Sequence, residues 1–133
     1  MITTKMNREI KFRAWHEQGK MIGWEELKYF VDLGSCFNDY KTLTLMQYTG
    51  LKDKNGKEIY EGDVVVFDEF IPGNKQSAGQ WIQNRSLKSL SISFKHGYFG
   101  VKGSGDDHIS LYSAQSEHCE IIGNIYENPE LLN

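Results

Sequence analysis

The chain has 133 residues, of which 39% are hydrophobic and 25% are charged, and its formal net charge is −3 at pH 7. This composition excludes an intrinsically disordered chain, and the length suits one domain that buries about two-thirds of its unfolded surface. The sequence has no run of about 20 apolar residues and no apolar leader, which predicts a cytoplasmic protein that does not enter a membrane. Cys36 and Cys119 are then expected to be reduced thiols.

Alternating side chains near the start predict an N-terminal β-hairpin. Ile10, Phe12 and Ala14 are apolar and flank two basic residues, which is the period of a half-buried strand. Gly19 offers a turn, and residues 21–24 return as the second strand.

A short helix is predicted over residues 25–33. Leu27, Phe30 and Val31 recur at helical spacing, and Gly34 is typical of a helix end. The same segment also suits an irregular strand. We favour the helix and expect it to act as a short helical connector between the hairpin and the rest of the chain.

The middle of the chain predicts a second hairpin and a central strand. Residues 42–48 are rich in β-forming side chains, and the dipeptide Asn55-Gly56 accepts the two positive φ values of a type I′ turn. Gly62 and Asp63 then open the apolar, β-branched run at residues 64–67, which we expect to be the central strand.

The second half predicts three more strands. Residues 91–95 and 98–102 alternate on either side of a tight turn at His96-Gly97, and residues 119–126 form the last strand. Pro129 ends the pairing, because proline has no N–H for a ladder.

Short strands at this spacing indicate a mainly β (α+β) fold with an SH3-like barrel in the C-terminal half, over about residues 61–127. Gly100 and Gly123 are expected to permit close backbone approach or a bulge. Six residues are predicted to lie in the barrel core: Val64, Val66, Phe94, Val101, Ile122 and Ile125.

Three segments carry a resemblance to a known family. They are Arg8-Glu-Ile-Lys-Phe-Arg-Ala-Trp15, the run from Leu45 to Phe67 that contains Tyr60-Glu-Gly-Asp-Val64, and Ile122-Gly-Asn-Ile-Tyr-Glu-Asn-Pro-Glu-Leu-Leu132. Together they resemble the YopX family of phage and prophage proteins, which has no established biochemical activity. The resemblance spans the chain and implies one domain over residues 1–133. Two places depart from the family pattern: His16 stands where Asp is usual, and the connection at residues 68–90 is longer.

Catalytic and metal-binding motifs are absent from the sequence. There is no Walker-type glycine loop, no Gly-x-Ser-x-Gly elbow and no His-Glu-x-x-His. His16, His96 and Cys36 leave open a metal site assembled only by folding. We expect no enzyme, no cofactor and no metal.

Three carboxylates lie close in sequence at Glu58, Glu61 and Asp63. An enzyme would need two of them to converge in a cleft with separated pKa values. We expect Asp63 instead to accept local backbone hydrogen bonds at the turn before its strand.

Charge placement is the most suggestive functional signal. Residues 103–133 hold six acidic residues and no Lys or Arg, whereas residues 70–105 hold no acidic residue at all. Basic and aromatic side chains are interleaved in the acid-free stretch, which is typical of single-stranded nucleic-acid binding. The candidate binding surface consists of Lys75, Trp81, Arg85, Lys88, Lys95, Tyr98 and Lys102.

The acidic C-terminal third is an alternative partner for these cations, within one chain or between chains. We therefore predict a non-catalytic protein that forms a homo-oligomer or binds a host or phage protein. A single-stranded nucleic-acid-binding barrel is the first alternative, and a small enzyme is the second.

Overall fold

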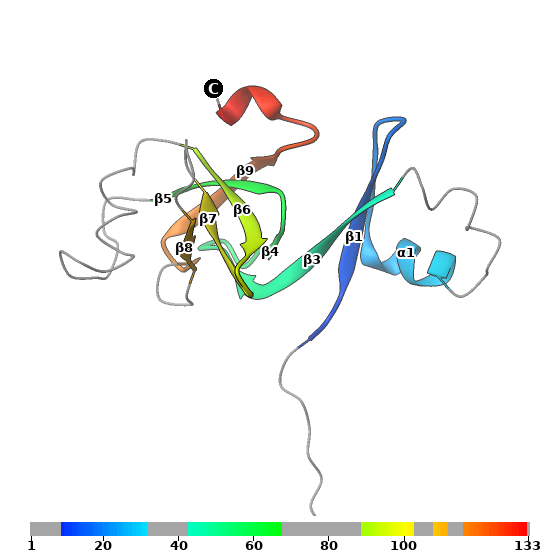
Figure 1. The fold of residues 1–133 in the computed structure, drawn as a ribbon, viewed down its shortest axis with the longest axis horizontal. Helices are drawn as coiled ribbons and strands as arrows, with labels where there is room; N and C mark the ends of the chain where they lie inside the picture. Colours follow the sequence, from blue (N-terminus) through cyan, green and yellow to red (C-terminus); the bar gives the residue numbers. More distant parts are fainter. Residues whose placement is uncertain (1–8, 32–42, 68–88, 103–107, 112–115, 133) are drawn as a thin grey trace, which may run out of the picture.

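The computed structural model describes residues 9–31, 43–67, 89–102, 108–111 and 116–132. In these ranges the fold is mainly β, with two antiparallel sheets and one α-helix. Figure 1 shows the N-terminal sheet beside a second, curled sheet, with β3 running between them. No helix in the described ranges is long and apolar enough to cross a membrane.

The N-terminal sheet has the strand order β2-β1-β3-β4. Its strands are β1 (Phe12–His16), β2 (Lys20–Ile22), β3 (Leu43–Lys52) and β4 (Glu58–Tyr60). The predicted first hairpin is confirmed, and its turn contains Gly19 at φ 97°. The first half of β3 pairs with β1 and its second half pairs with β4, so this strand continues past the end of β1.

Helix α1 (Trp24–Val31) forms close to the predicted position, with Glu25 and Glu26 in its first turn, where negative side chains stabilise the helix dipole. Its Leu27 is 1% exposed and packs with Ala14 and Ile22. The helix therefore covers one face of the N-terminal sheet. The expected connector role is not confirmed, because α1 packs mainly against β1 of the N-terminal sheet.

The turn chemistry differs from the prediction in one respect. Asn55-Gly56 lies in the β3–β4 turn as predicted, but only Gly56 has a positive φ there, of 79°. The two-residue turn with both φ values positive is instead His96-Gly97, at 57° and 86°. Asp53 explains the difference, because its carboxylate binds the N–H groups of Asn55 and Lys57 and sets a longer loop.

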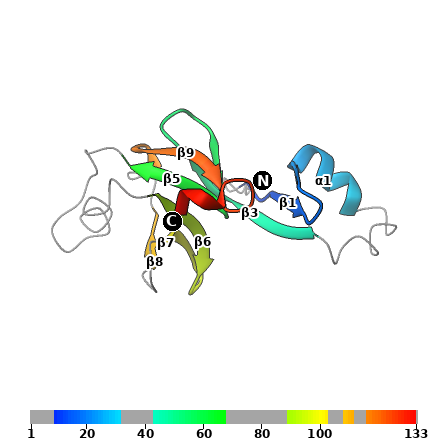
Figure 2. The same cartoon turned by 90° about the horizontal axis from the view of Figure 1, so that it is seen from above.

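The second sheet has the order β8-β7-β6-β5-β9 and is antiparallel throughout. Its strands are β5 (Asp63–Phe67), β6 (Leu90–Lys95), β7 (Tyr98–Lys102), β8 (His108–Ser110) and β9 (Cys119–Asn124). The four predicted strand runs thus belong to one sheet, as expected. Figure 2 shows the sheet curling, with η3 (Pro129–Leu132) following β9.

The predicted core is right at two of six positions. Val64 and Val101 are fully buried, and Val66 and Ile125 are half-buried. Phe94 is 50% exposed because it lies beside the β6–β7 turn, beyond the packed centre. The main cluster also contains side chains that were not predicted: Ile59, Val65, Phe67, Leu90, Ile92, Leu111 and Cys119.

A bulge in β9 explains why Ile122 is 38% exposed. Val64 pairs with Gly123 and Val65 pairs with Ile121, so Ile122 is the extra residue that has no partner in β5. The expected close approach at Gly123 is confirmed, since a Cβ there would lie 2.5 Å from Asn128 Oδ1 and 2.9 Å from Leu131 Cδ1.

Asp53 joins the β3–β4 turn to β9. Its side chain is buried, and besides the two turn N–H groups it accepts the N–H of Ile121 at 3.1 Å. The N–H of Lys54 donates to the carbonyl of Cys119 at 2.9 Å. One carboxylate therefore satisfies three backbone donors from two segments that are far apart in the sequence.

Replacing Asp53 with Ala should lower the free energy of unfolding by about 2–4 kcal/mol, because three donors lose a charged acceptor. Asp53→Asn should cost less, since one oxygen can still accept the two turn bonds. Urea unfolding measures both losses, and the exposed Glu117→Ala is the control, expected within about 0.5 kcal/mol of the parent. Equal stability of Asp53→Ala and the control would contradict this role.

Candidate binding surface

The β6–β7 hairpin brings three predicted surface residues onto one face. Lys95 lies directly opposite Tyr98, and Lys102 lies opposite Ser91 at the other end of the ladder. Residues that face each other across an antiparallel pair share a face, as do residues two apart in one strand. Lys95, Tyr98 and Lys102, hereafter the basic face, therefore project together, and all three are exposed.

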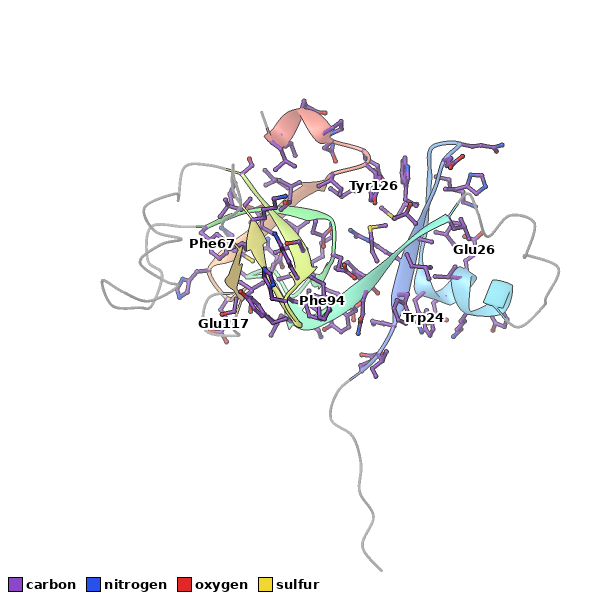
Figure 3. The ribbon with its side chains drawn as sticks, in the orientation of Figure 1. Trp24, Glu26, Phe67, Phe94, Glu117 and Tyr126 are labelled. Carbon is purple, nitrogen blue, oxygen red and sulfur yellow. The ribbon has the colours of Figure 1, made fainter. Side chains whose placement is uncertain are left out.

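The opposite face of the same hairpin carries an aromatic pair. Phe94 and Phe99 are cross-strand partners with ring centroids 4.9 Å apart at an interplanar angle of 62°, an edge-to-face contact. Phe94 remains 50% exposed, and Figure 3 shows it at the edge of the curled sheet. The sequence prediction put Phe94 in the core; its position directly before the Lys95-His-Gly-Tyr98 turn is the signal that was missed.

The cations of the basic face have no ion-pair partner in the described parts of the chain. Ion pairs there use Lys11, Arg13, Lys20, Lys28 and Lys54, but neither Lys95 nor Lys102. Their positive charge is therefore available to a partner outside the described residues. The other predicted surface residues, Lys75, Trp81, Arg85 and Lys88, lie outside the described ranges.

Asp63, the carboxylate weighed for catalysis, is buried in a structural network. Its Oδ2 accepts the N–H of Tyr60 at 2.8 Å, which confirms the predicted local backbone bond. Its Oδ1 accepts from Arg13 Nη2 at 2.8 Å, and the same nitrogen donates to the carbonyl of Glu61 at 3.2 Å. Sequence reasoning did not single out Arg13, which comes from β1 and whose Cζ also lies 4.9 Å from the centre of the Tyr60 ring.

Burial raises the pKa of Asp63 above its usual range, and the nearby Arg13 guanidinium opposes that rise. The two neighbouring carboxylates also have structural partners. Glu61 accepts the N–H of Gln47 at 2.9 Å, and Glu58 pairs with Lys11. Each of the three carboxylates thus contacts a backbone N–H group or a basic side chain.

The metal alternative gains no support from the described residues. Within the described ranges, no group of three His, Cys, Asp or Glu side chains could hold a metal ion. His16 ends β1 in the N-terminal sheet, whereas His96 lies in the β6–β7 turn of the other sheet. Cys36 lies outside the described residues.

Removing Arg13 should lower the free energy of unfolding, because the buried Asp63 carboxylate loses its charged partner. The size of this loss should depend on pH. In the folded parent the pKa of Asp63 is raised, so its contribution to stability is largest at low pH and falls as the pH rises through that pKa. Without Arg13 the pKa of Asp63 rises further, so stability decreases more as the pH rises. We expect Arg13→Ala to cost about 3–5 kcal/mol at pH 7 and clearly less near pH 4.

Urea unfolding across this pH range checks the expectation. The control is Arg13→Ala combined with Asp63→Asn, which removes the titrating group and should make the cost of losing Arg13 independent of pH. A single Arg13→Ala variant whose cost is the same at pH 4 and pH 7 would show that Arg13 acts only by packing on Tyr60.

Comparisons with known proteins found one matching family and a similar solved structure. The chain is similar to the crystal structure of protein EF1440 from Enterococcus faecalis, with a TM-score of 0.63 and 29% sequence identity, over 96% of this chain and 100% of that one. No curated protein matches it. The model of the YopX protein family matches residues 11–133, which include β1, the Arg13–Asp63 pair, both sheets and η3. The chain is therefore a member of the YopX family, as its three sequence segments predicted.

Proposed function

We propose that this protein is a non-catalytic, cytoplasmic protein of phage or prophage origin that acts by associating with further copies of itself through the β6–β7 hairpin. The observation that carries the proposal is the basic face. It presents two cations without an ion pair in the described residues, and Phe94, which is 50% exposed, lies on the opposite face of the same hairpin. A small protein gains little from exposing such a surface unless a partner covers it.

The strand order supports an SH3-like assignment for the curled sheet. Strands β5 to β8 pair with one another in sequence order, and the last strand, β9, pairs with the first, β5. This is the strand order of SH3-like barrels. Folds of this kind host many unrelated functions, so the function is argued from the surface and not from the fold.

The contacts of the three carboxylates support a non-catalytic role. Asp63, Glu61 and Glu58 each bind a backbone N–H or a basic side chain. A general acid or base needs a group that is open to a substrate and holds a useful pKa. The small-enzyme alternative has no described residue in its favour.

The choice of a second copy as the partner rests on charge. Among the described residues from 108 to 132, the charged side chains other than histidine are all acidic: Glu117, Glu120, Glu127 and Glu130. The chain thus supplies both a basic and an acidic surface. Complementary charge directs association and fixes which surfaces meet.

Single-stranded nucleic acid is the second candidate, favoured by Tyr98. This ring is 37% exposed and lies on the same face as Lys95 and Lys102. Aromatic rings that stack on bases beside cations that bind phosphates are the usual elements of single-strand binding.

Charge reversal on the basic face should weaken self-association. We expect the purified protein to form a discrete oligomer in light scattering after size exclusion, and Lys95→Glu or Lys102→Glu to shift it toward monomer. Higher salt should have the same effect, because exposed charges are screened. The control is Lys57→Glu, which makes the same charge change at an exposed position in the β3–β4 turn. A parent protein that is monomeric at all concentrations would contradict self-association.

Titration of the protein into labelled single-stranded oligonucleotides distinguishes nucleic-acid binding from self-association. If nucleic acid is the partner, binding should weaken as salt rises, with a log–log slope of about 0.7 per phosphate contact. Tyr98→Ala should then cost about 1–3 kcal/mol of binding free energy. Absence of binding at low salt, together with an oligomer that depends on Lys95, would reject nucleic acid.

A further inference from the structure

We infer that the turn end of the β6–β7 hairpin docks on the C-terminal segment of a second copy, so that copies join head to tail. The donor surface, called the hairpin tip, is Phe94 and Lys95. The receiving surface, called the C-terminal patch, is Glu127, Pro129, Glu130 and Leu132. This inference rests on the proposed self-association and specifies the two surfaces that meet.

The hairpin tip offers one apolar and one cationic side chain at the end of a rigid element. Phe94 is supported by the edge-to-face contact with Phe99, and the His96-Gly97 turn fixes the neighbouring backbone. Phe94 and Lys95 point to opposite faces of the hairpin, but both lie next to its end. A partner that meets the hairpin end-on therefore contacts both.

The C-terminal patch has the matching chemistry. Leu132 is 42% exposed, Pro129 is exposed beside it, and Glu127 and Glu130 are exposed carboxylates. No ion pair within the described residues uses either glutamate, whereas Glu120 in β9 already lies 3.7 Å from Lys54. The patch thus combines an aliphatic surface for Phe94 with carboxylates for Lys95.

The patch is held in place by bonds to β9. The N–H of Asn128 donates to the carbonyl of Asn124 at 2.9 Å, and Asn128 Oδ1 accepts the N–H of Asn124 at 3.2 Å. Leu131 lies against Gly123, where there is no space for a Cβ. Because the segment is ordered before a partner arrives, docking costs little conformational entropy.

The two surfaces lie on different sides of the curled sheet. Figure 1 shows η3 above the curled sheet, whereas the end of β6 that carries Phe94 lies at its lower edge, where Figure 3 labels this residue. We therefore place the contact between copies. Since the two surfaces differ, each docked copy still presents a free tip or a free patch, and assembly continues until a ring closes or a chain extends.

Two variants, each with one surface removed, test this arrangement. The double variant Phe94→Ala/Lys95→Ala lacks the hairpin tip but keeps the C-terminal patch. The variant Glu130→Lys keeps its own hairpin tip, but its altered C-terminal patch repels the tip of another copy. We expect each variant alone to be monomeric, with a dissociation constant raised about tenfold or more. An equimolar mixture should form a heterodimer and stop there, because one intact tip meets one intact patch. Light scattering reads the masses.

A charge swap guards against misfolding as the cause. Lys95→Glu and Glu130→Lys combined in one chain should recover the association that each single change removes, which unfolded variants would not do. If Glu130→Lys keeps the parent oligomer while the tip variant is monomeric, copies contact each other tip to tip and the inference is wrong, although self-association stands. If both variants keep the parent mass, another face is used. A monomeric parent rejects both the inference and the proposed function.

Discussion

The buried charge of Asp63 is the constraint on which the arrangement of the two sheets depends. The apolar cluster around Ala14 and the apolar cluster around Val65 are separate, although Ile59 of β4 belongs to the second cluster and Leu51 of β3 packs against it. Asp63 begins β5, which lies second from the edge of the curled sheet and not at its centre as predicted, and it binds Arg13 of the N-terminal sheet. Because an isolated carboxylate is costly to bury, the barrel strand reaches low energy only with β1 in place.

Strand β3 also connects the two halves of the molecule, through its continuous backbone. It pairs with β1 through its first half and with β4 through its second half, so one continuous backbone belongs to both halves of the molecule. The Trp15 and Tyr126 rings, 5.5 Å apart and nearly parallel, add a further contact between the same two halves. Polar and aromatic contacts thus join two apolar clusters that do not merge.

Local features of the sequence were sufficient for most of the strands, the helix and the positions of the turns, but the short strand β8 was not predicted. Alternation located β5, β6, β7 and β9, because side-chain period is a local property. Alternation did not determine which side chains are buried. The exposure of Ile122 depends on a bulge against β5, and that of Phe94 depends on its position at the end of the β6–β7 ladder. The Arg13–Asp63 pair joins residues 50 apart and has no local pattern at all. For the candidate binding surface, the sequence placed Lys95, Tyr98 and Lys102 together but missed the Phe94–Phe99 pair on the opposite face of the hairpin.

The bonds that Asp53 and Lys54 make to β9 also decide how this protein can associate. They occupy the N–H of Ile121 and the carbonyl of Cys119, groups on the edge of β9 that faces away from β5. An edge strand with open N–H and C=O groups recruits further strands and leads to aggregation. The β3–β4 loop blocks strand addition at this edge without adding another strand, so partners at this side of the barrel must recognise side chains and not the bare backbone.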